Sequence, residues 1–376
     1  MKSKKSDSLT FALFCGFLVF MLLLFVMLPE KDFSEKEKRY LASAPELTWE
    51  TLLSGSYGEA VETYLADHVP GRDLFVGINS YYDRLSGRQV AEEIYTLSDQ
   101  ALVEAPVKWN RTQAEKNIGA VQRFADTISQ QVDLMLVPSA GFIQEEKMKL
   151  LHDPYLDDLM IEEIYSMTGD NISCLNLIPT YEERAEEELY YNTDHHWTSL
   201  GAYYAFQEIA PLFNIQPTTL EDYTVYPVST SFEGTLSSKS GSHGALDTVE
   251  IYVPNSPIDY YVTYADGEII SSLYKRDALE QKDHYTVFFG GNYSRVDITT
   301  TANTGRCLLI FKDSYANCMV QFLYPYFDHI TMIDPRYYYD NLELVITSES
   351  ITDVLFLYNA DTFLGDTSLA DVLVSE

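Results

Sequence analysis

The amino-acid sequence predicts an α/β protein in which helices flank a parallel β-sheet, with an antiparallel β insertion and an N-terminal transmembrane helix. Short apolar runs of strand length alternate with amphipathic helical patterns along most of the chain, which is typical of parallel strands joined by crossover helices. Residues 217–304 interrupt this alternation with aromatic and β-branched runs between turn residues, which favours antiparallel strands. Residues 9–28 form a twenty-residue apolar run.

The apolar run near the N-terminus predicts a membrane anchor. Residues 1–8 form a short tail with three lysines, and twenty helical residues at 9–28 would span roughly 30 Å, the thickness of the hydrocarbon core. A cleaved signal peptide is the alternative, but its apolar core is shorter, and no small-residue cleavage site follows closely here. Lysines and arginines balance on the two sides of the run, so charge does not decide its orientation.

The rest of the chain is expected to form a stalk and one folded domain. Residues 29–55 are polar and charged and are predicted to be the stalk, and the domain covers residues 56–376. Strands of the sheet are expected at residues 90–97, 133–138, 174–178, 307–311, 330–333 and 353–358, and helices at 111–130, 157–167 and 316–327. The insertion at 217–304 is predicted to form a rim beside the functional site.

Composition excludes some classes of function. Of the 376 residues, 46% are hydrophobic, which is enough for a sizeable core and excludes global disorder. The formal net charge of −32 argues against nucleic acid as a partner, because a polyanion would be repelled and no basic stripe is present. An acidic, tyrosine-rich surface suits a neutral carbohydrate better than a phosphate-rich polymer.

The most informative stretch is residues 190–206, in which an aspartate and two histidines precede an apolar helical pattern. A helix is expected to begin near Thr198 or the following serine, both N-cap residue types. Asp194 and His196 are two residues apart in an extended turn, so their side chains should point the same way. A carboxylate in that place can orient an imidazole as a general base. His195 should point away and take a structural or rim role.

Ser314 is the candidate nucleophile. It follows the predicted strand at 307–311 and precedes a helical pattern, and a serine on a strand-to-helix turn exposes its hydroxyl near the positive end of a helix dipole. In this interpretation His196 removes the proton of the hydroxyl, and Asp194 holds the imidazole in the useful tautomer. The competing interpretation is a histidine held by a local aspartate in a helix cap.

Five motifs together carry a resemblance to a known family. They are TDHHWTSLGAYYAF at 193–206, FKDSYANC at 311–318, FFGGN at 288–292, DPRYY at 334–338 and ADHVPGRD at 66–73. The chain resembles the DHHW family of bacterial envelope proteins, which is similar to the alginate acetylation proteins with their permuted SGNH-hydrolase-like domain. The resemblance implies an SGNH-like fold and an extracytoplasmic location. Lys312 stands where the family usually has a glycine before the Asp-Ser pair.

An acyl-transfer site also needs donors for an oxyanion. The backbone N–H groups of the nucleophile and of Tyr315 are candidates at a helix start. Asn359 follows the last predicted strand, where SGNH-like proteins often place an oxyanion asparagine, and Asn292 competes with it; either could be a turn residue instead. Arg336 lies at the same sheet edge and could clamp a substrate or pair with Asp334. Trp197 could be a sugar platform, although packing is favoured.

The sequence and the resemblance together predict a membrane-anchored, extracytoplasmic protein that adds or removes acyl groups, with acetyl favoured, on a cell-envelope polysaccharide. No cofactor and no metal are expected, and a membrane-bound O-acyltransferase is a candidate partner. One alternative is a non-catalytic envelope protein that binds glycans or such an acyltransferase, which Lys312 favours. Another is a metal-dependent hydrolase that uses Asp194 and His196 with Asp67 or His68, although no metal-ligand spacing supports it.

Overall fold

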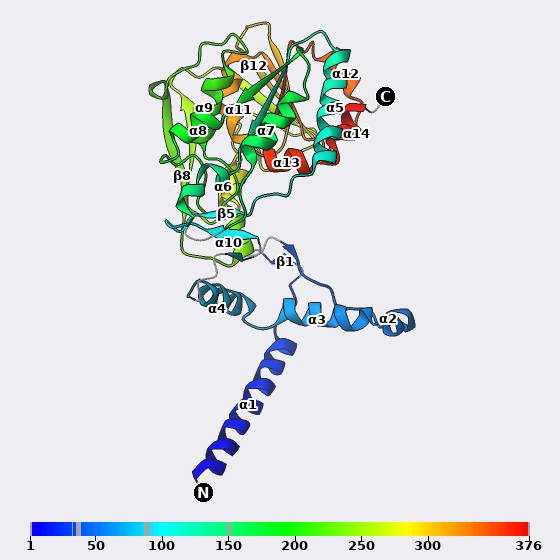
Figure 1. Ribbon diagram of the computed structural model, residues 1–376, viewed down its shortest axis with the longest axis vertical. Coiled ribbons are helices and arrows are strands. Elements are labelled where there is room, and N and C mark those ends of the chain that lie inside the picture. Colours follow the sequence, from blue (N-terminus) through cyan, green and yellow to red (C-terminus); the bar gives the residue numbers. More distant parts are fainter. Residues whose placement is uncertain are drawn as a thin grey trace. The chain divides into compact units, whose positions relative to one another are not determined.

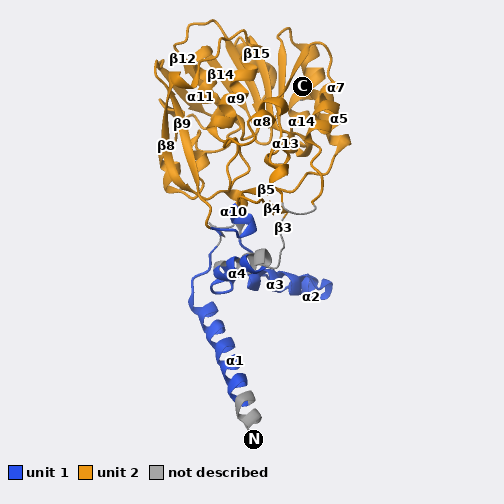
Figure 2. Ribbon diagram, turned by 60° about the vertical axis from the view of Figure 1, so that its left-hand side comes forward, with its two compact units in different colours: residues 1–92, 237–243 blue, residues 93–236, 244–376 orange. Residues whose placement is uncertain are grey.

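The computed structural model describes residues 2–31, 33–34, 39–85, 90–91, 93–148 and 152–374. Two compact units are present (Figure 2): residues 1–92 with 237–243, and residues 93–236 with 244–376. Residue 1 of the predicted tail and residues 32 and 35–38 of the predicted stalk lie outside the described residues. The second compact unit begins at Glu93, whereas the sequence predicted one domain from residue 56.

The first unit consists mainly of helices (Figure 1). Its elements are α1 (Lys2–Met27), β1 (Phe33–Ser34), β2 (Arg39–Tyr40), α2 (Trp49–Ser54), α3 (Ser56–His68), α4 (Arg72–Leu85) and β3 (Val90–Ala91). Within α1, Ser8–Met27 has a mean hydropathy of 2.8. Among the described residues it is the one helical stretch that is long and apolar enough to cross a membrane. A signal sequence near an N-terminus has the same properties. His68 ends α3, and its Nδ1 lies 3.0 Å from the carbonyl oxygen of Tyr64.

A mixed eight-stranded sheet forms the centre of the second unit, in the order β11-β10-β12-β14-β13-β15-β6-β7. Its parallel part contains β6 (Val132–Val137), β7 (Ile172–Asn176), β13 (Cys307–Lys312), β14 (His329–Ile333) and β15 (Asp353–Asn359). All six residues of β6 are buried, as expected for a strand covered on both faces. The mixed α/β class predicted from the sequence is thereby confirmed.

Successive residues of the central strands face two different layers. Leu308 and Ile310 of β13 belong to the same core as α9 (Ser199–Ile209) and α11 (Ala316–Leu323), whereas Leu309 and Phe311 join the core of the opposite face. That second core includes α5 (Arg111–Thr127), α7 (Asp157–Ser166), α12 (Leu342–Ser348), α13 (Ala360–Gly365) and α14 (Leu369–Val374), of which α5, α13 and α14 lie together (Figure 1). The alternation follows from the two-residue period of a strand.

The β-rich segment at 217–304 is partly continuous with the main sheet. Strands β10 (Tyr260–Tyr264), β11 (Ile269–Ile270) and β12 (Arg295–Thr300) extend the sheet in antiparallel fashion beyond β14, where they pair with its open edge. Strands β8 (Tyr223–Phe232) and β9 (Asp247–Pro254) form a separate antiparallel ladder. The aromatic run at residues 285–289, which was expected to be a strand of this segment, instead overlaps the 3-10 turn η4 (His284–Val287).

Short elements complete the chain. They are β4 (Ile94–Thr96), β5 (Leu102–Glu104), α6 (Ala140–Ile143), η1 (Glu145–Lys147), α8 (Ile178–Glu183), η2 (Leu220–Asp222), α10 (Thr235–Ser240), η3 (Arg276–Glu280) and η5 (Tyr324–Tyr326). The parallel strands β6, β13, β14 and β15 end at one edge of the sheet, because parallel neighbours share direction. Ser314, Tyr315 and Arg336 lie in the loops that follow these strands, and Asn359 is the last residue of β15, as is usual for site residues in open α/β sheets.

Candidate active site

The structure brings Asp194, His196 and Ser314 into one line of contacts. Ser314 Oγ lies 2.7 Å from Nε2 of His196, and Nδ1 of the same ring lies 2.5 Å from Oδ1 of Asp194. The aspartate and the histidine are buried, whereas the serine is partly exposed. A hydroxyl, an imidazole and a carboxylate in this order can move a proton from the hydroxyl to the imidazole. This is the arrangement that the sequence predicted for a nucleophile, a base and an orienting acid.

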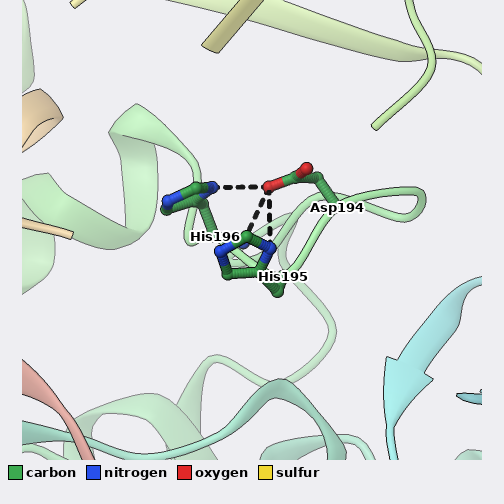
Figure 3. A group of neighbouring side chains, drawn as sticks. All are labelled: Asp194, His195 and His196. Carbon is green, nitrogen blue, oxygen red and sulfur yellow. Dashed lines mark hydrogen bonds and ion pairs between the residues drawn. The ribbon is translucent and has the colours of Figure 1, made fainter. Parts of the chain in front are cut away.

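His195 does not point away from Asp194, and this corrects the sequence-based expectation. Figure 3 shows both imidazoles facing the same carboxylate, and Nδ1 of His195 lies 3.7 Å from Oδ1 of Asp194. The two histidine rings lie 4.0 Å apart between centroids. Residues 192–196 form bends rather than a strand, so the alternation of side chains that holds in an extended chain does not apply.

Long-range contacts that no sequence pattern predicted hold the Asp194 turn in place. Asp247 accepts hydrogen bonds from the backbone N–H and hydroxyl of Thr193, at 2.8 and 2.6 Å. The backbone N–H of Thr235 donates to Oδ2 of Asp194 at 2.8 Å. A Cβ atom at Gly234 would lie 2.3 Å from Cβ of Asp194, so only glycine allows this approach. No local pattern marks Asp247 or Gly234 as site residues.

The electrostatics favour an ionised aspartate and a neutral base. Burial alone would raise the pKa of Asp194, but the imidazoles of His195 and His196 and the hydrogen bond from Thr235 outweigh it and hold that pKa well below its usual range. Burial lowers the pKa of His196, and His195 lowers it further, against the opposing effect of Asp194. A neutral imidazole is the form that can accept a proton.

Tyr285 packs against the candidate base His196, and the sequence analysis did not identify it as a site residue. Its ring stacks on His196 with centroids 3.8 Å apart and planes at 13°, and its hydroxyl donates to the carbonyl oxygen of Ser314 at 2.9 Å. One side chain therefore contacts both the candidate base and the candidate nucleophile turn. The FFGGN motif lies three residues further along, but its presence did not indicate this role.

Trp197 is a packing residue, which excludes the sugar-platform role weighed for it. Its side chain is 0% exposed, and Nε1 donates to the carbonyl oxygen of Tyr315 at 2.9 Å. The helix after it begins as predicted: Thr198 is the N-cap of α9, and its hydroxyl accepts a bond from the N–H of Gly201 at 3.1 Å.

Two further oxyanion and substrate candidates, Tyr315 and Arg336, are already engaged. The N–H of Tyr315 donates to Oδ1 of Asp313 at 2.9 Å, so it is not the free donor that was expected, because the carboxylate turns back over its own loop. Arg336 pairs with Asp334 through bonds of 2.8 and 2.6 Å, which realises the pairing alternative rather than the clamp. Burial raises the pKa of Asp313 to about 6, against the bonds it accepts.

The two asparagines differ in their surroundings. Asn359 is the N-cap of α13, where Oδ1 accepts from the N–H of Asp361 at 3.0 Å, and it also lines a cavity beside His195. Asn292 is exposed, and its Oδ1 lies 3.2 Å from Nζ of Lys312 and 3.2 Å from Nδ2 of Asn317. Asn359 therefore lies beside the candidate site, whereas the side-chain oxygen of Asn292 accepts a hydrogen bond from the buried Lys312.

Lys312 occupies the position before Asp313 without opening the turn. Its side chain is 1% exposed, and Nζ donates to Oδ1 of Asn317 at 2.9 Å and lies 3.8 Å from Oδ2 of Asp334. Burial lowers the pKa of this lysine to about 8, against the attraction of Asp334. Its partners on α11 and after β14 accommodate the side chain where a glycine would be usual in the family.

A small cavity lies beside the candidate triad. Its volume is about 70 Å³, and His195, Tyr315 and Asn359 line it together with Ser139, Gly141 and Asp361. Liquid water occupies about 30 Å³ per molecule, so this space holds a few non-hydrogen atoms. The cavity is thus suited to a small group bound next to the line of contacts from Asp194 to Ser314.

Two groups of side chains in the described part of the chain could offer three metal ligands. One is Asp194 with His195 and His196, whose closest contact is the 2.5 Å bond between His196 and the carboxylate. The other is Asp297, His329 and Glu349, but Arg295 already donates to both carboxylates of that group. A cation would have to displace the arginine there or the hydrogen bond at the first site.

These features define a mixed α/β protein with a candidate Ser-His-Asp site at the carboxyl edge of a large central sheet. The family model of DHHW proteins matches residues 157–333, a range that contains all three residues of the site, and it confirms the resemblance found in the sequence. No curated protein sequence matches this chain.

Solved structures support the same fold. A DHHW family protein from Eubacterium siraeum DSM 15702 is 24% identical, covers 76% of this chain and 98% of its own, and has a TM-score of 0.65. Bacillus cereus PatB1, described with a sulfonyl adduct, is 20% identical, with coverage of 74% and 97% and a TM-score of 0.61. The O-acetyltransferase domain of Pseudomonas putida AlgJ is 12% identical, with coverage of 75% and 99%; its TM-score of 0.47 carries no argument about this chain.

Proposed function

We propose that this protein is a membrane-anchored, extracytoplasmic acyltransferase or esterase with an SGNH-like fold. Its substrate class is a cell-envelope polysaccharide, and acetyl is the favoured acyl group. The observation that carries the proposal is the continuous contact from Asp194 through His196 to Ser314, at 2.5 and 2.7 Å. The apolar α1 supports the anchor, and the acidic, tyrosine-rich composition supports a neutral glycan.

The first chemical step forms an acyl-enzyme. Nε2 of His196 accepts the proton of Ser314 as Oγ attacks the acyl carbonyl carbon, and Asp194 stabilises the imidazolium that results. The carbonyl re-forms as the bond to the leaving alkoxide breaks, and the imidazolium returns its proton to that alkoxide. The donor leaves as an alcohol, and the acyl group remains as an ester on Ser314.

The second step differs between an esterase and a transferase only in the attacking hydroxyl. His196 deprotonates water or a sugar hydroxyl, which attacks the ester carbonyl and releases Ser314 with its proton restored. Two donors are proposed for the negative oxygen that forms in each step: the N–H of Ser314, which has no acceptor within the described ranges, and the side-chain amide of Asn359. The cavity of about 70 Å³ supports a short acyl group.

The test is covalent labelling of the full chain in detergent. A sulfonyl fluoride should react with Ser314, and peptide mass spectrometry would locate the adduct; the similar PatB1 structure is described with a sulfonyl adduct. Ser314→Ala should remove both the label and the release of nitrophenol from p-nitrophenyl acetate. Ser166, an exposed serine on α7, provides the matched control as Ser166→Ala. Labelling elsewhere, or undiminished hydrolysis by folded Ser314→Ala, would return the chain to the metal-dependent or non-catalytic alternatives.

A further inference from the structure

A second cavity lies over the loop that follows β14, and the proposed chemistry does not use it. Its volume is about 410 Å³, which lies within the range of small-ligand sites. The lining includes Arg336, Tyr338, Tyr339, Asp340 and Asp371. It thus combines aromatic rings with hydrogen-bonding groups that no step of the triad requires.

Exposed aromatic surface is the first unusual property of this loop. Tyr339 is 90% exposed and Tyr337 is 49% exposed, whereas Tyr338 between them is 2% exposed and holds the loop to the core. A tyrosine buries a large apolar ring when a ligand covers it, and it keeps a hydroxyl for hydrogen bonding. Tyr339, which lines the cavity, therefore offers a platform for a flat, partly apolar ligand.

The charged groups restrict which ligand fits. Arg336 is held by two bonds to Asp334, so its guanidinium is already neutralised. Asp340 and Asp371 add negative charge to the lining. Of these two carboxylates, Asp371 forms an exposed ion pair with Lys116, which offsets its charge. An anionic polymer would be repelled, whereas hydroxyl groups of a neutral sugar can donate to both carboxylates.

The position of the cavity connects it to the candidate nucleophile. β14 is the direct neighbour of β13, and Oδ2 of Asp334, at the start of the loop, lies 3.8 Å from Nζ of Lys312. Lys312 is two residues before Ser314 along the chain. The loop and the nucleophile turn thus follow neighbouring strands at the same edge of the sheet.

We propose that this cavity is a subsite for a neutral pyranose chain, with a sugar ring stacked on Tyr339 and its hydroxyls bound by Asp340 and Asp371. The subsite holds the polysaccharide acceptor beside the candidate triad, and in that role it rests on the proposed function. A pyranose ring has an apolar face of C–H bonds and an equatorial rim of hydroxyls, which matches an aromatic ring flanked by carboxylates.

Binding is tested without catalysis, on the full-length Ser314→Ala protein in detergent. Saturation-transfer NMR and calorimetry would use cellotetraose and N,N′,N″,N‴-tetraacetylchitotetraose as probes, at low and high salt. Adding Tyr339→Ala should weaken binding about fivefold to tenfold, the effect of one lost stacking contact. Tyr261→Ala, at a tyrosine of β10 that is 46% exposed, should bind as the parent does. Affinity should not depend on salt, because the ligand is neutral.

Three results would overturn the subsite: no binding of either tetrasaccharide, equal binding by the Tyr339→Ala protein, or affinity that falls steeply with salt. In the protein with Ser314 intact, Tyr339→Ala should also raise KM for a tetrasaccharide acceptor and leave p-nitrophenyl acetate hydrolysis unchanged. Absence of that hydrolysis in the intact protein would contradict the proposed function, whereas the binding result would stand on its own.

Discussion

The ring of Tyr285 lies flat against the imidazole of His196, with 3.8 Å between centroids and 13° between planes. The same residue bonds to the carbonyl oxygen of Ser314 at 2.9 Å. Because a stacked ring limits rotation of the imidazole, Tyr285 acts as a positioning residue that keeps Nε2 directed at the hydroxyl. The contact separates two effects, stacking and hydrogen bonding, that substitutions can test individually.

Tyr285→Phe should lower kcat for p-nitrophenyl acetate only a few-fold, because it keeps the ring and loses one neutral hydrogen bond of about 1 kcal/mol. Tyr285→Leu removes the stacking partner and should lower kcat about tenfold or more, since loss of orientation alone is costly. The pH profile of kcat is measured for both variants, because a loss of positioning should shift it whereas general destabilisation should not. Equal activity of the two variants, both folded by circular dichroism, would contradict the positioning role.

Substitution of the triad should remove activity without unfolding the protein. Ser314→Ala, His196→Ala and Asp194→Ala should each reduce kcat about a thousandfold or more, and the losses should not add, because the three residues act as one unit. Asp194→Asn should cost less than Ser314→Ala, since it leaves the nucleophile and the base in place. The measurement is hydrolysis of p-nitrophenyl acetate, with circular dichroism of each variant; additive losses in double variants would count against a shared mechanism.

Activity should fall on the acid side as His196 becomes protonated and loses its role as a base. Its pKa is lowered by burial and by His195, so the midpoint of the acid limb of kcat/KM should lie below the ordinary histidine value of about 6.5. His195→Gln removes one of the two causes and should move this midpoint upward. A pH series for both proteins checks the sign, and a downward shift in the variant would refute the explanation.

Gly234→Ala should disrupt the Asp194 turn. The added Cβ would lie 2.3 Å from Cβ of Asp194 and 2.7 Å from the carbonyl oxygen of Thr193, so backbone has to move. We expect a loss of stability of about 1–3 kcal/mol, the range for overpacking, together with a large loss of activity. Gly365→Ala is the control, because a Cβ there meets nothing within 4 Å. Thermal unfolding and ester hydrolysis are measured on both variants. A Gly234→Ala protein as stable and as active as the Gly365→Ala control would contradict this prediction.

Deletion of residues 1–28 tests the anchor. The apolar window of α1 is 0% buried, so its removal exposes no core, and the truncated chain should leave the membrane fraction and remain folded. The full chain should stay with membranes after a carbonate wash. Aggregation of the truncated chain would show that α1 stabilises the folded part, and a full chain shortened at its N-terminus in cells would favour a signal peptide.

Much of the fold was predictable because its signals are local. The apolar runs of β6, β13, β14 and β15 lie within one residue or two of their predicted bounds, and Thr198 caps α9 as its residue type indicated. Strand burial, capping and helical period depend on residues within a few positions of one another. The candidate triad residues were also identifiable, since the chemistry of each is carried by its own side chain and by the turn on which it lies.

Tertiary structure alone decided how these parts meet. The bond between His196 and Ser314 joins residues 118 positions apart, and the contacts of Asp194 with Gly234 and Thr235 join residues about 40 apart. The direction of His195, the engaged N–H of Tyr315 and the extension of the sheet by β12 were likewise not encoded in any local period. Register, close approach and satisfaction of buried polar groups depend on which distant segments share one core, and only the folded chain determines that.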